Sequence, residues 1–215
     1  MNQDAILLDF LLKRSKAWTD ASYATYGADP YNVTDVQQLG RAERRLLAWE
    51  EQCKRTFEQR SQPDYKSRSI LEEQYEDDLL NDLMSFSKLW VFGLYEIMRT
   101  IKEELLVKNG LKLSQNFPAP FHHFDEFFYR LEVVRMPLAK HQLRRMSGAH
   151  RAGLLFDTEY GSTVWEVYSH KDQSLIRVNR REVGDEFLRL AMMVKKERGE
   201  INKTAHDGDK LEVQS

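Results

Sequence analysis

Residues 161–179 read GSTVWEVYSHKDQSLIRVN, and the spacing of apolar residues changes from helical to alternating where this stretch begins. On both sides of residues 169–173 the side chains alternate with a period of two, which is typical of half-buried β-strands. The stretch therefore predicts a β-hairpin. Asn179 is followed three residues later by Glu182, the spacing of a helix capping box, so we expect a last helix to begin where the hairpin ends.

The chain before residue 161 has helical spacing almost throughout. Apolar residues recur every three or four positions in four runs, each bounded by turn residues such as Gly, Pro, Asn or Ser. The first predicted helix ends before Gly27, and the next three cover about residues 35–60, 69–106 and 121–135.

Two features of these runs carry further expectations. Residues 89–98 are almost wholly apolar, so this part of the third helix should be buried on all sides, and Gly93 should allow another helix to cross it closely.

Proline favours the first position of a helix, so Pro137 should interrupt the fourth helix and begin a fifth. That fifth helix should end near Ser147, before Gly148.

Together the patterns predict a mainly α protein, a helical bundle of five to six helices with a C-terminal β-hairpin and a final helix. We expect the bundle to span residues 1–160, and the hairpin and helix packed on it to span residues 161–194. Residues 195–215 are charged and poor in apolar side chains, which predicts a disordered tail.

The composition excludes several classes of protein. The 32 Lys and Arg residues nearly balance the 34 Asp and Glu residues, so no global positive field exists and any nucleic-acid binding must be local. The single cysteine, Cys53, excludes an internal disulfide and a cysteine-based zinc cluster, and suggests a cytoplasmic protein. No stretch of about 18 uncharged apolar residues is present, so we expect no contact with a membrane.

We also expect no cofactor and no metal ion. The adjacent His122 and His123 would point about 100° apart on a helix, which does not suit a shared ion. A capped helix start explains this pair and the acidic residues after it.

The segment from Val133 to Phe156 contains no Asp or Glu but many positive charges. In a chain with a net charge of -2, such a segment predicts a local anion-binding surface, which the N-terminus of a helix would strengthen. Its basic residues are Arg135, Lys140, Arg144, Arg145 and Arg151, accompanied by the titratable His141 and His150.

Arg135 followed by five residues and then His141, late in a helical bundle, resembles the motif of the HEPN superfamily. The helix of residues 89–98, with Tyr95, Glu96 and Arg99, is also similar to the central helix of such bundles. The resemblance implies an RNA-binding protein and a metal-independent endoribonuclease of toxin or defence type. It implies that Arg135 stabilises the scissile phosphate and that His141 transfers a proton, while the remaining basic residues, Lys140, Arg144, Arg145 and Arg151, bind RNA.

A different interpretation of the same segment stays open. The basic residues can form an ordinary solvated helix face that meets the acidic residues near Glu72 and Glu76 of the same chain. The protein would then be a non-enzymatic helical scaffold or protein-interaction module. We expect a homodimer, because residues 89–98 and 121–134 hold much aromatic surface, and a protein partner or antitoxin is a further expected ligand.

Overall fold

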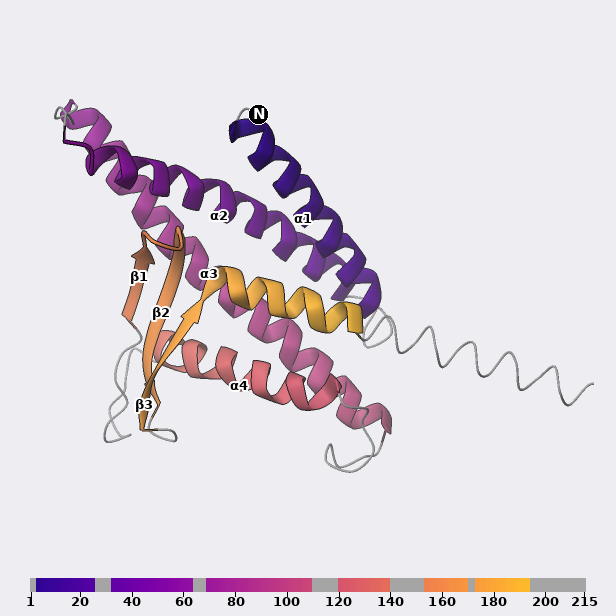
Figure 1. Cartoon of the computed structure of the whole chain (residues 1–215). Helices are drawn as coiled ribbons and strands as arrows, with labels where there is room; N and C mark the ends of the chain where they lie inside the picture. Colours follow the sequence, from indigo (N-terminus) through magenta and orange to yellow (C-terminus); the bar gives the residue numbers. More distant parts are fainter. Residues whose placement is uncertain are drawn as a thin grey trace, which may run out of the picture.

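A computed structural model describes residues 3–25, 32–63, 69–109, 120–139, 153–169 and 173–193 of the chain (Figure 1). These residues form five helices and three strands, which confirms the predicted mainly α class with a small sheet and a final helix. In chain order the elements are α1 (Gln3–Thr25), α2 (Asn32–Arg60), α3 (Ile70–Asn109), α4 (Pro120–Ala139), β1 (Gly153–Asp157), β2 (Ser162–Ser169), β3 (Ser174–Asn179) and a C-terminal helix over residues 180–193.

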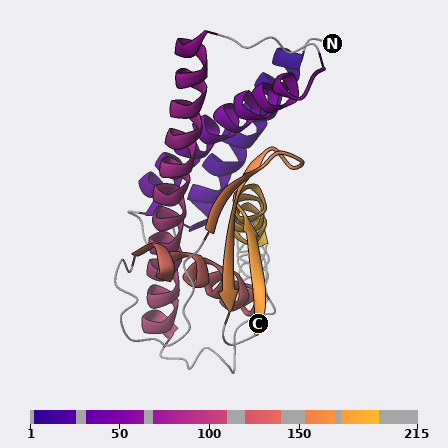
Figure 2. The ribbon, with the colours of Figure 1, turned by 90° about the vertical axis from the view of Figure 1, so that its left-hand side faces the viewer.

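The longest helix, α3, is the axis on which the other elements are arranged. Helix α2 packs along α3, α1 packs along α2, and α4 packs on the C-terminal part of α3 (Figure 1). The sheet and the C-terminal helix lie together beside α3, as the second view shows (Figure 2). Among the described residues, no helix combines the length and the apolar character that crossing a membrane requires.

The sheet has three strands, so the prediction of a two-stranded hairpin was incomplete. The strands pair antiparallel in the order β1-β2-β3, with Leu155 opposite Val164 and Val167 opposite Ile176. Strand β1 lies before residue 161, in the segment that the sequence assigned to the bundle. Its residues Leu154 to Phe156 form a short continuous apolar run, which shows no period of two and is not distinguishable from a piece of buried helix by pattern alone.

The predicted break at Pro137 was wrong. Helix α4 continues through this residue to Ala139, so the proline lies in the last turn. A proline there removes the donor that would bond to the carbonyl oxygen of Val133, but a kink so close to the end of the helix displaces only the two helical residues that follow. The rest of the predicted fifth helix lies outside the described residues. Helix α2 also begins earlier than predicted, at Asn32 rather than at Asp35.

The core is built around aromatic side chains from distant segments of the chain. Trp18 of α1 stacks on Phe187 of the C-terminal helix with ring centroids 5.1 Å apart, and its edge meets Trp90 of α3 at 6.2 Å. Residues 89–98 are largely buried as predicted, but Leu89 is 64% exposed. The C-terminal helix begins with the predicted cap, since Asn179 Oδ1 accepts a hydrogen bond from the backbone N–H of Arg181 at 2.8 Å.

Two glycines allow helices to approach closely. A Cβ atom at Gly93 would lie 3.0 Å from Leu39 Cδ1, which confirms the predicted close crossing of α3 by another helix. A Cβ atom at Gly40 of α2 would lie 2.5 Å from Trp18 Cβ of α1, a separation that real contacts of this kind essentially never show. The α1–α2 crossing therefore depends on the absence of a side chain at Gly40, whereas the atom nearest to Gly93 is the flexible end of Leu39.

Replacing Gly40 with alanine should destabilise the protein, although the same change in an ordinary helix stabilises it by about 1 kcal/mol. The added methyl group would overlap Trp18, and overpacking of this kind costs about 1–3 kcal/mol. Urea unfolding, monitored by circular dichroism, measures the difference in the free energy of unfolding between wild type and the variant. Gly153→Ala is the control, because its Cβ would meet nothing closer than the Glu166 carbonyl oxygen at 3.8 Å. An unchanged or higher midpoint for Gly40→Ala would contradict the close crossing.

Candidate functional site

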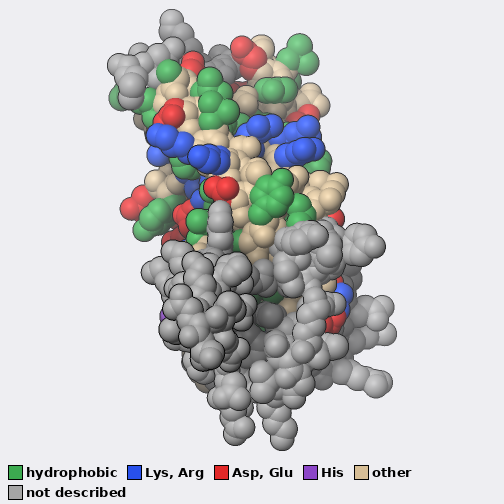
Figure 3. Space-filling view, turned by 90° about the vertical axis from the view of Figure 1, so that its right-hand side faces the viewer, with side chains coloured by type: hydrophobic (Ala, Val, Ile, Leu, Met, Phe, Trp, Pro, Cys, Tyr) green, Lys and Arg blue, Asp and Glu red, His purple; other side chains and the backbone are tan. Residues whose placement is uncertain are grey.

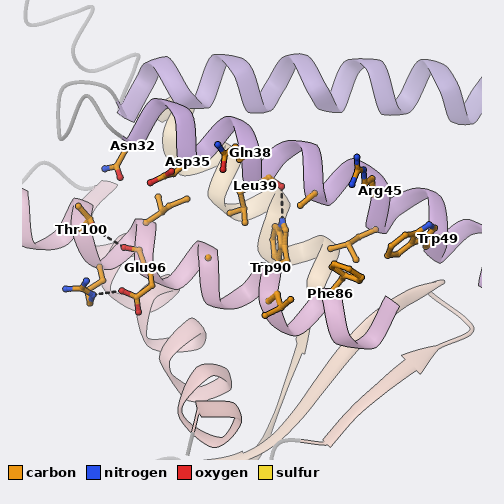
Figure 4. A pocket seen from close by; sticks show the side chains of 16 residues that line it. Asn32, Asp35, Gln38, Leu39, Arg45, Trp49, Phe86, Trp90, Glu96 and Thr100 are labelled. Carbon is orange, nitrogen blue, oxygen red and sulfur yellow. Dashed lines mark hydrogen bonds and ion pairs between the residues drawn. The ribbon is translucent and has the colours of Figure 1, made fainter. Parts of the chain in front are cut away.

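Helices α2 and α3 run antiparallel and leave a groove of about 570 Å³ between them (Figure 4). The C-terminal helix lies behind this groove, on the other side of the α2–α3 pair (Figure 4). Positions recurring every three or four residues on each helix line it, because such positions share one helix face. They are Asn32, Asp35, Gln38, Leu39, Ala42, Arg45, Leu46 and Trp49 of α2 and Phe86, Leu89, Trp90, Gly93, Glu96, Ile97, Arg99 and Thr100 of α3.

The floor of the groove is apolar and rigidly held. Leu39, Leu46, Trp90 and Ile97 are buried there. The indole Nε1 of Trp90 donates a hydrogen bond to the backbone oxygen of Leu39 at 3.2 Å, which ties the floor of α3 to α2 (Figure 4). The floor is therefore preformed and does not need a ligand to assemble it.

One end of the groove carries exposed aromatic and aliphatic surface. Trp49 meets Phe86 edge to face with ring centroids 5.5 Å apart and an angle of 62° between the rings (Figure 4). Phe86 is 47% exposed and Leu89 is 64% exposed. Exposed apolar groups that adjoin an apolar concavity mark interaction surfaces more often than scattered single residues do.

The other end is polar (Figure 4). Arg99 Nε donates to Glu96 Oε2 at 2.8 Å, and Arg99 Nη1 donates to Glu103 Oε1 at 2.6 Å. Asn32 is only 3% exposed, and its Nδ2 atom has no hydrogen-bond partner among the described residues. A buried donor without an acceptor costs about 1–3 kcal/mol, so an oxygen atom placed at this end of the groove would be bound favourably.

The α2 side of the groove carries positive charge. Arg45 and Arg41, one turn before it, are exposed, and neither has an ion pair or hydrogen bond with the described residues. Arg45 lines the groove and points away from α3 (Figure 4). On the face that lies on the right-hand side of Figure 1, Lys and Arg side chains form a band across the described upper half (Figure 3).

Arg135 is the one predicted site residue that the structure describes. Its guanidinium lies 4.6 Å from the centroid of the Tyr95 ring, and its Nη2 atom is 3.5 Å from Glu96 Oε1. The side chain is 31% exposed, while its Nε atom is buried with no hydrogen-bond partner among the described residues. Glu96 therefore contacts both Arg135 and the groove. The other predicted residues, Lys140, His141, Arg144, Arg145 and Arg151, lie outside the described residues.

The described lining of the groove carries few groups that could act as an acid, a base or a nucleophile. Among the described residues that line the groove there is no histidine, cysteine, lysine or serine, and the two carboxylates are Asp35 and Glu96. Glu96 is held by Arg99 and Arg135, which is the arrangement of an ion pair rather than of a general acid or base. In the described residues, His, Cys, Asp and Glu side chains form no group of three or more that could hold a metal ion.

A second cluster of polar residues, which the sequence did not reveal, lies in the core. Glu43 and Glu50 of α2 are fully buried, as is Arg180 of the C-terminal helix. Glu50 accepts hydrogen bonds from Arg180 Nε at 2.9 Å, from Arg180 Nη2 at 2.6 Å and from the backbone N–H of Thr163 at 3.0 Å. The carboxylate thus joins α2 to β2 and to the C-terminal helix.

Glu43 has the same role two turns earlier on α2. Arg14 donates to its two oxygens from Nε and Nη2, each at 2.8 Å, and the indole of Trp18 donates to it as well. Arg14 also pairs with Asp185 of the C-terminal helix. The signal in the sequence was the position of both glutamates, since 43 and 50 share the apolar face of α2 with Val36, Leu39 and Leu46.

This cluster is structural, because bulk solvent does not reach it and its carboxylates are already satisfied. Burial alone would raise the pKa of Glu50, but the charge and hydrogen bonds of Arg180, followed by those of Arg181, hold the pKa below its ordinary value. Burial raises the pKa of the neighbouring Cys53 thiol to about 11, so this thiol stays protonated and unreactive at neutral pH.

The surface that suggested a homodimer is used inside one chain. Trp90, Tyr95, Phe124 and Phe127 are all buried among the described residues. Tyr95 stacks on Phe128 of α4 with ring centroids 5.1 Å apart. Much of the described aromatic surface of these two segments is therefore used within one chain, and the homodimer stays a prediction.

Comparisons with known proteins return no relative. No family model, no curated protein and no solved structure matches the chain. The residues themselves are therefore the basis for assigning a function.

Replacing Glu50 with glutamine should lower the free energy of unfolding by about 3–5 kcal/mol, because Arg180 would remain as a buried charge without its main partner. The loss should depend on pH. A depressed carboxyl pKa stabilises the fold at pH values above the ordinary value of 4.5, and this contribution is lost as the pH falls through the folded-state pKa. The difference between wild type and variant should therefore be constant near neutrality and shrink below about pH 4.5.

The matched control is Glu51→Gln, at the next residue of the same helix. Glu51 is partly exposed and pairs with Arg55 at 3.1 Å on the surface, so its loss should cost less than about 1 kcal/mol. Urea unfolding over a range of pH values measures both variants. Equal losses for the two variants, or a difference that does not change with pH, would show that Glu50 is not the buried partner of Arg180.

Proposed function

We propose that this chain is a non-enzymatic helical interaction module, which binds a segment of a partner protein in the groove between α2 and α3. The observation that carries this function is the exposure of Phe86 and Leu89 beside Trp49, at the mouth of a groove with a buried apolar floor. Aromatic and aliphatic groups around a concavity are the usual anchors of protein interfaces.

The shape of the groove favours an elongated partner. Its α2 wall runs from Asn32 to Trp49, which corresponds to about 25 Å of helix. A partner helix of four to five turns, or a shorter extended segment, matches this length. Helices that place an apolar face in a groove between two other helices are a recurring mode of recognition.

A peptide selected from a library of amphipathic sequences, each about 17 residues long to match the groove, should bind Leu89→Asp at least about tenfold more weakly than wild type. An aspartate there brings a charge to the apolar mouth of the groove. Because Leu89 is 64% exposed, the melting temperature should change little. Fluorescence anisotropy with the full chain measures the affinity.

Leu71→Asp is the matched control, since Leu71 lies on the same helix, is 77% exposed and does not line the groove. An equal loss of peptide affinity in Leu89→Asp and Leu71→Asp, or no loss of affinity in either, would contradict binding in the groove.

A second candidate function is the HEPN-like one, an RNA-binding protein with metal-independent endoribonuclease activity of toxin or defence type. The observation in its favour is the placement of Arg135. Its guanidinium is held over Tyr95 while some of the side chain stays exposed, and Glu96 is a partly exposed partner that a phosphate could replace.

If this second function holds, His141→Ala and Arg135→Ala should each abolish RNA cleavage with little change in melting temperature. Cleavage should persist in EDTA and leave cyclic phosphate ends, as attack by the 2'-hydroxyl requires. RNA binding should also weaken steeply with salt. Arg145→Ala is the control, because it removes a charge of the same basic segment but leaves the Arg135–His141 pair, so it should retain more activity than the other two variants. Cleavage that survives both Arg135→Ala and His141→Ala would exclude this mechanism.

A further inference from the structure

We infer that the partner segment is an acidic amphipathic helix, whose carboxylates face Arg41 and Arg45 on the α2 side of the groove. This rests on the proposed binding function of the groove. It specifies the chemistry of the occupant from three separate features: the apolar mouth, the two arginines and the buried amide of Asn32.

The two arginines supply the charge. Arg45 lines the groove, and Arg41 precedes it by one helical turn on the same side of α2, about 40° farther round the helix and just outside the lining. Both are exposed, and neither has a carboxylate partner among the described residues, whereas Arg55 and Arg99 on the same two helices are paired with glutamates. Two such arginines one turn apart match carboxylates one turn apart on a helix that lies alongside.

The apolar mouth sets the spacing of the partner's anchors. Trp49, Phe86 and Leu89 form one apolar site at this end, and the buried floor continues through Leu46 toward Leu39. An occupant that covers both must present apolar side chains about every three or four residues over several turns. At the far end, the Nδ2 atom of Asn32, which no described residue satisfies, offers a hydrogen bond to an oxygen of the occupant.

The distribution of charge distinguishes a peptide from a nucleic acid. A nucleic acid carries a negative charge on every nucleotide, so it would place phosphates along the whole groove, including the end that holds Asp35 and Glu96. A peptide can confine its carboxylates to the stretch beside Arg41 and Arg45. The apolar floor likewise matches leucine-like side chains better than a sugar-phosphate backbone.

The test uses two fluorescein-labelled peptides, each about 17 residues long, with the same apolar positions. They carry either glutamates or lysines at the flanking positions of the turns that would lie beside Arg41 and Arg45, and neutral residues at the other flanking positions. Binding to the full chain is measured by anisotropy at low and moderate salt. The glutamate peptide should bind at least about tenfold more tightly than the lysine peptide, and salt should weaken it. The double variant Arg41→Glu with Arg45→Glu should reverse this preference.

Arg44→Glu is the matched control. Arg44 is exposed on the same helix but lies about 100° around it from Arg45, on the side turned away from the groove. This variant should keep the preference for the glutamate peptide. The double variant Arg41→Gln with Arg45→Gln removes the two charges without reversing them. The glutamate and lysine peptides should bind this variant with equal affinity. It keeps the test decisive if the double glutamate variant does not fold.

Different outcomes separate this inference from the proposed function. Equal binding of both peptides to wild type, still lost in Leu89→Asp, would overturn the acidic partner and leave binding in the groove intact. Failure of both peptides to bind, or binding that Leu89→Asp does not affect, would overturn both. Displacement of the glutamate peptide by a single-stranded oligouridine would overturn the acidic helix in favour of RNA.

Discussion

The buried contact between Glu50 and Arg180 is the constraint on which the arrangement of the other elements depends. A carboxylate and a guanidinium that are both removed from water are tolerable only if each finds the other with good geometry, because the desolvation of either one alone is very costly. Glu50 lies on α2 and Arg180 opens the C-terminal helix, directly after β3. Their pairing therefore fixes the C-terminal helix against α2, with 130 residues between the two partners. Thr163 brings the middle strand to the same carboxylate.

This constraint also determines which face of α2 remains open. Glu43 and Glu50 turn one face of the helix toward α1 and the C-terminal helix, where Arg14, Trp18 and Arg180 satisfy them. Gly184 belongs to the same contact, since a side chain there would strike Glu43 and Arg14. Positions between these glutamates in the sequence, such as Ala42 and Arg45, are left facing the other way. Helix α3 covers them only in part, and the uncovered area is the groove.

The sequence predicted those features that depend on local pattern. The long helices, the cap at Asn179 and the close crossing at Gly93 follow from periodicity and from the properties of single residues. It did not predict β1, since a short apolar run carries no period, or the passage of α4 through Pro137. The sequence also did not predict the groove, because Trp49 and Phe86 come into contact only when α2 packs on α3. The burial of Glu43 and Glu50 was missed as well, although their spacing of seven residues places both among apolar neighbours.

The two candidate functions are not physically independent, because both involve Glu96. This residue lines the polar end of the groove, accepts a hydrogen bond from Arg99 and lies 3.5 Å from Arg135. A positive group of an occupant that reached Glu96 would compete with Arg135 for the same carboxylate, and a phosphate at Arg135 would leave Glu96 to Arg99 alone. If both sites bind a ligand, occupation of one would change the charge that surrounds the other, and linkage would make the effect reciprocal. Glu96 of α3 thus lies between the groove and the C-terminal part of α4, where it contacts Arg135.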